Sequence, residues 1–232
     1  FAITKDTAKQ LIRDFVNKRK FFAHPKFKEE FTTENIMGVY FPYMIVDINS
    51  HAKFIGHGEH QIKKYLKGNS NNTKTYYDAD LYYVEREFDL AIQGLTIESN
   101  SDKLNVTSQN STNNIINAIM PFDIENCVKY DSNFLKGYTS EKRDINVDQL
   151  KSLVDLQSQD IARHSCNETV KYYDRGVAWD MEQLNVKGQQ WKATYLPVWL
   201  YSFQQINGNN KVLHYVAVNA RTKEIMGSVP IH

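Results

Sequence analysis

Two apolar runs with the same order of residues restrict the fold most strongly. YFPYMIVDI begins at Tyr40 and YLPVWLYSF begins at Tyr195, and each places Tyr, a large residue and Pro before further bulky apolar residues. Such runs predict β-strands. Because proline has no N–H to donate to a sheet ladder, Pro42 and Pro197 are expected on edge strands or at bulges. The recurrence predicts an internal duplication with two equivalent strands, and two unrelated strands that share Tyr-x-Pro are the alternative.

The first half of the sequence predicts a helix followed by strands. Thr4 is a suitable cap for a helix whose apolar residues recur every three or four positions. Lys18, Arg19 and Lys20 are expected in its last turn, where cations suit the helix dipole. The further elements expected are a helical turn over residues 26–31, strands over 39–48 and 52–66 with a turn at 49–50, a turn over 68–73, one long or two shorter strands over 76–97, and helical turns around 115–119.

The second half repeats this order. Asn146 is a suitable cap for a long amphipathic helix with Leu150, Val154 and Ile161 on its apolar stripe. The expected strands lie over residues 177–186, 191–205, 211–220 and 225–229, with a hairpin turn over 207–210. A helix followed by an antiparallel meander therefore occurs twice, in residues 1–120 and 121–232, as two domains or as one continuous domain. Helices that are segregated from strands in this way predict an α+β fold built on antiparallel sheet.

Composition limits the size, charge and location of the protein. The 232 residues suffice for a core without disulfides or metal, and a formal net charge of +1 gives no overall field to attract nucleic acid or an anionic membrane. Cys127 and Cys166 are too few for a disulfide framework and fit a reducing compartment. No apolar stretch reaches the ~18–20 residues of a transmembrane helix. A cytoplasmic location is expected, and the start at Phe1 without an initiator Met indicates a fragment of a longer gene product.

The segment HAKFIGHGEH, which begins at His51, contains residue types that bind metals. On a strand, His51, His57 and Glu59 share one face, but His51 would lie ~20 Å from His57, so one strand cannot bring all three to one ion. His57 and Glu59 are therefore weak candidates for a metal pair, and a solvated strand face is the favoured interpretation. No cofactor is expected in this part of the protein.

Other reactive residues give no local catalytic pattern. Glu85, Glu87 and Asp89 share strand parity, which suits a solvent-facing row or, as the alternative, a cation or acid–base site. His164 and Cys166 are two residues apart on the expected helix and therefore do not face each other. The sequence contains no G-x-S-x-G, P-loop, H-E-x-x-H, G-x-G-x-x-G or C-x-x-C motif. The sequence therefore favours a protein without catalytic activity. An enzyme whose active site is formed by residues far apart in the sequence is the alternative.

Two groups of residues are candidates for binding. Exposed aromatic side chains are expected to form one patch, although Trp199 suits a core better. These aromatic candidates are Tyr76, Tyr77, Tyr82, Tyr83, Trp179 and Trp199. Lys18, Arg19 and Lys20 belong to a basic N-terminal stretch that suits phosphate contact. Neighbouring acidic residues dilute this stretch, so nucleic-acid binding is the less favoured of the two.

Three stretches resemble a known family. They are ENIMGVYFPYMIVD from Glu34, IMPFDIENCVKYDSNFLKGYTSEKRDI from Ile119 and YLPVWLYSFQQINGNNKVLHYVAVNARTKEIMGSVPI from Tyr195. They are similar to the body of uncharacterised TFIIB-type zinc-ribbon-containing proteins of Gram-positive bacteria. The resemblance implies an upstream four-cysteine ribbon and, in some members, segments that look transmembrane. Zinc is accordingly expected only in such a ribbon, and a membrane tether only in the full-length protein. The run YVAVNARTKEIMG is also similar to the ends of PepSY-like and cystatin-like modules, which mostly bind or inhibit.

The residues and this resemblance together predict a non-catalytic binding or scaffold body with an unknown protein partner. A nucleic-acid-associated accessory protein, in which the ribbon would be the reader, is the first alternative. A metal-dependent hydrolase that uses His57 and Glu59 is the second.

Overall fold

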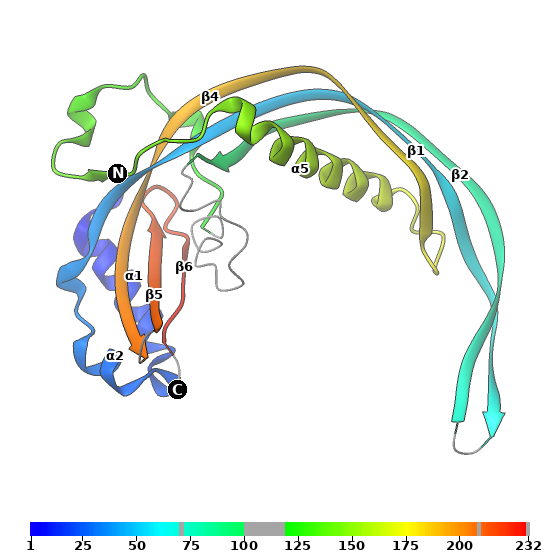
Figure 1. Cartoon of the computed structure of the whole chain (residues 1–232), viewed down its shortest axis with the longest axis horizontal. Helices are drawn as coiled ribbons and strands as arrows, with labels where there is room; N and C mark the ends of the chain where they lie inside the picture. Colours follow the sequence, from blue (N-terminus) through cyan, green and yellow to red (C-terminus); the bar gives the residue numbers. More distant parts are fainter. Residues whose placement is uncertain (70–71, 100–118, 208–209, 231–232) are drawn as a thin grey trace. The chain divides into compact units, whose positions relative to one another are not determined.

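The computed structural model describes residues 1–69, 72–99, 119–207 and 210–230 of the chain. Its strands form a mostly antiparallel sheet and its helices are separate from them, which confirms the expected α+β fold (Figure 1). The strand order is β2-β1-β4-β5-β6, and β3 pairs with β1 in parallel. The strands are β1 (Met37–Asn69), β2 (Asn72–Glu98), β3 (Thr139–Ser140), β4 (Val177–Asn207), β5 (Asn210–Asn219) and β6 (Ile225–Gly227). The α-helices within the described residues are α1 (Lys5–Asn17), α2 (Pro25–Glu30) and α5 (Val147–Glu168).

These elements form two compact units. Unit 1 consists of Phe1–Ile45, Thr96–Asn146 and Lys192–His232, and unit 2 consists of Val46–Leu95 and Val147–Trp191. Each unit draws on both halves of the sequence, so the units are made up differently from the expected halves. The internal duplication stays a prediction.

Helix α1 follows the predicted apolar spacing. The Thr4 side chain caps it by accepting the Thr7 N–H at 3.3 Å. The helix buries Ala8, Ile12, Phe15 and Val16. The prediction that Lys18, Arg19 and Lys20 form its last turn is wrong, because α1 ends at Asn17. The Arg19 N–H bonds to the Val16 carbonyl three residues back, and this tighter bond closes the helix before the basic residues.

Helix α5 confirms the long helix predicted after Asn146. Its buried residues recur every four positions and form one stripe. They are Leu150, Val154, Ser158, Ala162 and Cys166. Ala162 and Cys166 pack against Ala52 and Phe54 of β1 within unit 2. Ile161, which was predicted on the stripe, is only half-buried, because Ala162 takes the buried position.

Strands β1 and β4 are longer than predicted. The turn predicted at Asn49-Ser50 is wrong, because β1 continues through these residues. Ser50 is buried and its hydroxyl donates to the Leu90 carbonyl at 3.2 Å, so a partner on β2 satisfies the polar group inside the strand. The break predicted between the strands 177–186 and 191–205 is also wrong, since β4 runs through it beside β1. For residues 76–97, where one long strand or two shorter strands were expected, the structure has one long strand, β2.

Several predicted loops fall at the limits of the described residues. The expected turns over 68–73 and 207–210 centre on residues 70–71 and 208–209, which lie outside the description. β4 and β5 pair on either side of the second turn, with Asn207 opposite Asn210. The helical turns expected around 115–119 lie almost entirely in residues 100–118, which are also outside it.

The two prolines occupy matching places in the sheet. β1 and β4 are interior strands in the strand order, so the expected edge position is wrong. Each proline instead lies where a neighbouring strand ends. The Pro42 carbonyl accepts the N–H of Ser99, directly after β2, and the Pro197 carbonyl accepts the N–H of Ala220, directly after β5, both at 3.0 Å. Each proline, which has no backbone N–H, therefore lies where the ladder of hydrogen bonds to the neighbouring strand ends.

The sheet of unit 1 is buried on two faces. Trp199, Tyr201 and Phe203 of β4 pack with the apolar stripe of α1. The alternating residues Val198 and Leu200 pack on the other face. There they meet Val39, Phe41, Tyr43, Ile119 and Phe122. This strand alternation decides which side chains of β1 and β4 can reach each face.

Candidate functional site

A cavity of about 750 Å³ in unit 1 is the principal candidate site. We call it the aromatic pocket. Its walls come from β1, from β4 and from the segment that follows Pro121. The lining residues used below are Tyr40, Pro42, Val128, Lys129, Tyr130, Phe134, Arg143, Tyr195, Pro197 and Arg221.

Both Tyr-x-Pro segments contribute to this pocket. Tyr40 and Pro42 are two residues apart on β1, and Tyr195 and Pro197 are two apart on β4, so each pair lies on one face of its strand. Tyr195 and Pro197 share their parity with Trp199, which places them on the face that carries α1. The pocket thus joins two segments that are far apart in the sequence because β1 and β4 are neighbours in the sheet.

Exposed apolar and aromatic side chains line part of the pocket. Val128, Tyr130 and Phe134 are 72%, 62% and 53% exposed. The Tyr130 ring lies 6.0 Å from the Tyr195 ring, measured between centroids. Burial and the nearby Tyr138 raise the pKa of the Tyr40 hydroxyl, which therefore stays a neutral hydrogen-bond donor at physiological pH. The pocket offers apolar surface with a few polar groups at its margin.

Asn219 fixes the segment that forms the outer wall. It is fully buried at the end of β5, and its amide donates to the carbonyls of Ile119 and Pro121 at 3.0 and 3.2 Å. Its side-chain oxygen accepts the N–H groups of Arg221 and Thr222 at 2.9 and 3.1 Å. One buried side chain thereby ties the start of the wall to the turn after β5.

The charges at the pocket are only partly compensated. Arg221 forms an ion pair with Asp123, and this guanidinium holds the pKa of the Asp123 carboxyl below its usual value. The side chains of Lys129 and Arg143 have no ion-pair partner within the described part of the chain. Asp131 also lines the pocket, and its carboxylate accepts the Asn133 N–H at 2.8 Å. The two cations therefore exceed this carboxylate by one charge, and the pocket margin favours an anionic group on a ligand.

The predicted tyrosine patch is exposed but divided in the structure. All four tyrosines lie on β2 and all are exposed, with Tyr83 at 62%. Strand alternation places Tyr76 and Tyr82 on one face and Tyr77 and Tyr83 on the other. The Tyr82 ring lies 5.7 Å from Tyr173, whereas the Tyr83 ring lies 6.3 Å from His57.

The two tryptophans proposed for the patch lie in packed surroundings. Trp199 is buried and its indole N–H donates to the Ile3 carbonyl at 2.8 Å, in agreement with the expectation of a core residue. Trp179 packs against the core beneath α5 and its N–H donates to Asn167 at 3.0 Å. Neither extends the exposed tyrosine surface.

Lys18, Arg19 and Lys20 are exposed beyond α1 in unit 1. The Arg19 guanidinium lies 3.6 Å from the centroid of the Phe15 ring and donates to the Phe15 carbonyl at 3.2 Å. Part of the predicted phosphate-contact group is thus engaged with its own helix.

His57 and Glu59 share a strand face but have different partners. His57 Nδ1 lies 2.7 Å from Asp180, and Glu59 accepts a hydrogen bond from the Tyr77 hydroxyl at 3.1 Å. Within the described residues, no group of three His, Cys, Asp or Glu side chains is arranged to hold a metal ion.

The acidic row of β2 pairs with cations from β1, its neighbour, and from β4, the next strand in the sheet. Glu85 bonds to Lys53 at 2.7 Å and Asp89 bonds to Lys187 at 2.9 Å. Both ring nitrogens of His51 lie 2.8 Å from carboxylate oxygens, one of Asp89 and one of Glu87. The bonds to Asp89 and Glu87 raise the pKa of His51. The bonds from Lys187 and His51 lower the pKa of Asp89, and the bond from His51 lowers the pKa of Glu87. The row follows the predicted solvent-facing arrangement.

The cysteines occupy contrasting positions. Cys166 is buried on the inner face of α5, and burial raises the pKa of its thiol, which makes it a poor nucleophile. Cys127 is exposed at the aromatic pocket, with its sulfur 3.6 Å from the Thr194 hydroxyl.

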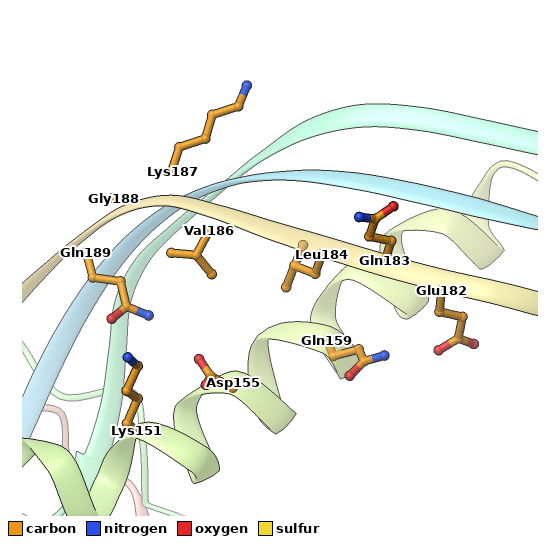
Figure 2. Close-up of a pocket in the computed structure, with 10 residues that line it drawn as sticks. All are labelled: Lys151, Asp155, Gln159, Glu182, Gln183, Leu184, Val186, Lys187, Gly188 and Gln189. Atoms are coloured by element: carbon orange, nitrogen blue, oxygen red, sulfur yellow. The ribbon is translucent and has the colours of Figure 1, made fainter.

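A second cavity, of about 680 Å³, lies between α5 and β4 in unit 2, and we call it the polar pocket (Figure 2). Figure 2 shows Lys151, Asp155 and Gln159 on the helix side and Lys187 pointing away from the helix. Glu182, on the strand side, bonds to Arg163 Nε at 2.8 Å. The polar pocket is thus lined largely by polar groups, of which Glu182 and Lys187 have partners inside unit 2.

Sequence reasoning missed the aromatic pocket. The repeated Tyr-x-Pro motif and the aromatic run around Tyr130 were the available signals, but no local pattern shows that β1 and β4 are neighbours. Comparison with protein-family models, with curated proteins and with solved structures finds no match for the chain. None of the helices in the described part of the chain has the length and apolar character needed to cross a membrane.

Proposed function

We propose that this chain is a non-catalytic binding body that holds a segment of a partner protein in the aromatic pocket. The observation that carries the proposal is a cavity of about 750 Å³ that is lined by several aromatic side chains, of which Tyr130 and Phe134 are exposed. That volume falls within the range of roughly 300–1,000 Å³ of binding pockets. Large exposed aromatic side chains around a cavity are typical of surfaces that a partner covers.

The pocket chemistry narrows the class of ligand. Tyr130, Phe134 and Tyr195 favour an aromatic or aliphatic side chain from the partner. Lys129 and Arg143 favour a carboxylate beside it. An extended peptide with an apolar side chain next to Asp or Glu satisfies both requirements.

A catalytic role has less support from the same site. Cys127 and Thr194 are neighbours, but no histidine is among the described residues that line the pocket, so an activating base for the thiol is lacking there. The expectation of a zinc-ribbon protein fits a binding body of this kind, because the ribbon would lie elsewhere in the longer protein.

The proposal is tested by selecting peptides from a random displayed library against the full chain. We expect the selected peptides to combine an aromatic or large aliphatic residue with an acidic one. Tyr130→Ala should raise their Kd by roughly tenfold or more, measured by isothermal titration calorimetry. Tyr83→Ala is the matched control, because Tyr83 and Tyr130 are both 62% exposed. Equal losses in the two variants, or a loss only in the Tyr83 variant, would contradict the assignment to the aromatic pocket.

A further inference from the structure

The β1–β2 ribbon ends in a group of lysines next to two stacked tyrosines. We call residues 62–67 of β1 and 74–78 of β2 the basic ribbon end. Both segments belong to unit 2, and Figure 1 shows these ends of β1 and β2 side by side, beyond the other elements of that unit. This surface is separate from the aromatic pocket in composition and lies in a different unit.

The lysines at the basic ribbon end differ in ion pairing from other charged residues on the same strands. Lys63, Lys64, Lys67 and Lys74 are exposed, and none has an ion-pair partner within the described residues. Nearer the middle of β1, by contrast, Lys53 pairs with both Glu85 and Glu87. The positive charge of the ribbon end is therefore available to an anionic partner.

One face of this end combines the lysines with aromatic rings. The rings of Tyr65 and Tyr76 are nearly parallel, with an interplanar angle of 17° and centroids 6.2 Å apart. Lys67 Nζ lies 5.4 Å from the first centroid and 5.8 Å from the second. By strand alternation, Lys63 lies on the face of Tyr65, and Lys74 on the face of Tyr76.

One carboxylate on this face is already engaged. Asp78 accepts a hydrogen bond from the Tyr65 hydroxyl at 3.2 Å. Asp80, two residues further along β2, lies on the same face. Three lysines thus stand against two aspartates on this face. We infer that this face binds single-stranded nucleic acid, with lysines on the phosphates and bases stacked on the tyrosine rings.

A membrane surface is the competing partner, and the arrangement of side chains favours nucleic acid. Ile62 and Leu66 are 64% and 67% exposed, as a lipid-binding segment would require. Alternation places them with Lys64 on the opposite face of β1, away from the other lysines and the rings. The face richest in cations therefore carries aromatic rings, which stack with unpaired bases, and not aliphatic side chains.

The test is fluorescence anisotropy of a labelled oligothymidylate with the full chain at several salt concentrations. The variant Lys63→Gln/Lys67→Gln/Lys74→Gln should weaken binding by roughly tenfold or more at low salt. It should also reduce the slope of log K against log salt by about 2, because each phosphate contact on a single strand contributes about 0.7. The variant Tyr65→Leu should weaken binding by roughly fivefold or more through lost stacking.

A matched control changes the same charge elsewhere. Lys5→Gln/Lys18→Gln/Lys20→Gln removes three cations of unit 1 and should leave the affinity within about twofold and the salt slope unchanged. Loss of binding in this variant alone would assign nucleic-acid contact to the end of α1 and overturn the inference. Absence of oligonucleotide binding by the natural chain at low salt, or binding only to phosphatidylserine vesicles through Ile62 and Leu66, would overturn it as well. Circular dichroism of each variant confirms that the exposed substitutions leave the fold intact.

Discussion

The aromatic pocket of unit 1 and the polar pocket of unit 2 have similar volumes, about 750 and 680 Å³, but differ in the side chains that line them. Each pocket contains an ion-paired carboxylate, Asp123 with Arg221 and Glu182 with Arg163, and each also contains a lysine without an ion-pair partner among the described residues, Lys129 and Lys151. Exposed aromatic side chains, Tyr130 and Phe134, line the aromatic pocket and not the polar pocket. Volume and charge therefore do not separate the two pockets, and the exposed aromatic surface is the better guide to a binding site.

The largest effect is expected where the aromatic pocket depends on one buried residue. Asn219→Ala removes four hydrogen bonds and leaves buried backbone groups unpaired, so we expect a loss of about 2–4 kcal/mol in the free energy of unfolding. Urea denaturation measures this loss. Peptide affinity should fall as well, because the outer wall loses its anchor.

Asn126→Ala provides the control for Asn219. Asn126 is exposed and its amide donates to Asp123 at 2.7 Å. Its removal should cost less than about 1 kcal/mol. Similar costs for both asparagines would show that Asn219 does not hold the pocket wall.

An intermediate effect is expected at the polar pocket. Arg163→Met removes the guanidinium that bonds to Glu182 through more than one nitrogen, and Glu182 is 18% exposed. Partial exposure of Arg163 limits the expected loss of unfolding free energy to about 1 kcal/mol. Thermal denaturation measures it, and peptide affinity should not change.

Lys171→Met is the matched comparison for Arg163. Its ion pair with Glu168 is exposed on both sides, so Lys171→Met should leave the free energy of unfolding essentially unchanged. If Arg163→Met lowered peptide affinity while the protein stayed folded, the division of roles between the two pockets would be wrong.

The smallest effect is expected from the charge row of unit 2 and depends on pH. Bonds to Asp89 and Glu87 raise the folded-state pKa of His51 above about 6.5, its usual value. The protonated ring therefore stabilises the fold fully below that unfolded-state pKa, and this stabilisation is lost as pH rises through the folded-state pKa. His51→Gln should lower stability at pH 5 and match the natural chain at pH 9, measured by urea denaturation. A difference that persists or grows at pH 9 would argue against a charged His51.

Local patterns predicted the elements that depend on short-range periodicity. The cap at Thr4 and the stripe of α1 follow from residue type and side-chain spacing alone, whereas spacing left open whether residues 76–97 form one strand or two. The predicted turn at Asn49-Ser50 was wrong because a long-range hydrogen bond to Leu90 lets Ser50 remain in a buried strand. The residues around Asn49 and Ser50 do not show that a distant residue will accept this hydrogen bond.

The candidate site depended on information that spacing does not provide. Tyr40 and Tyr195 line one pocket because β1 and β4 are adjacent, and Asn219 brings the segment after Ile119 to the same place. The repeated Tyr-x-Pro motif indicated that the two strands deserved comparison. The matching bonds of Pro42 and Pro197 agree with the proposed duplication without establishing it.

Photo-crosslinking of a selected peptide compares the two pockets most directly. p-Benzoylphenylalanine is placed at Phe134 of the aromatic pocket in one protein and at Val186 of the polar pocket in another, since both positions are exposed. We expect a peptide crosslink from position 134 and none from position 186, identified by mass spectrometry. A crosslink from position 186 alone, or equal crosslinks from both positions, would contradict the assignment of binding to the aromatic pocket.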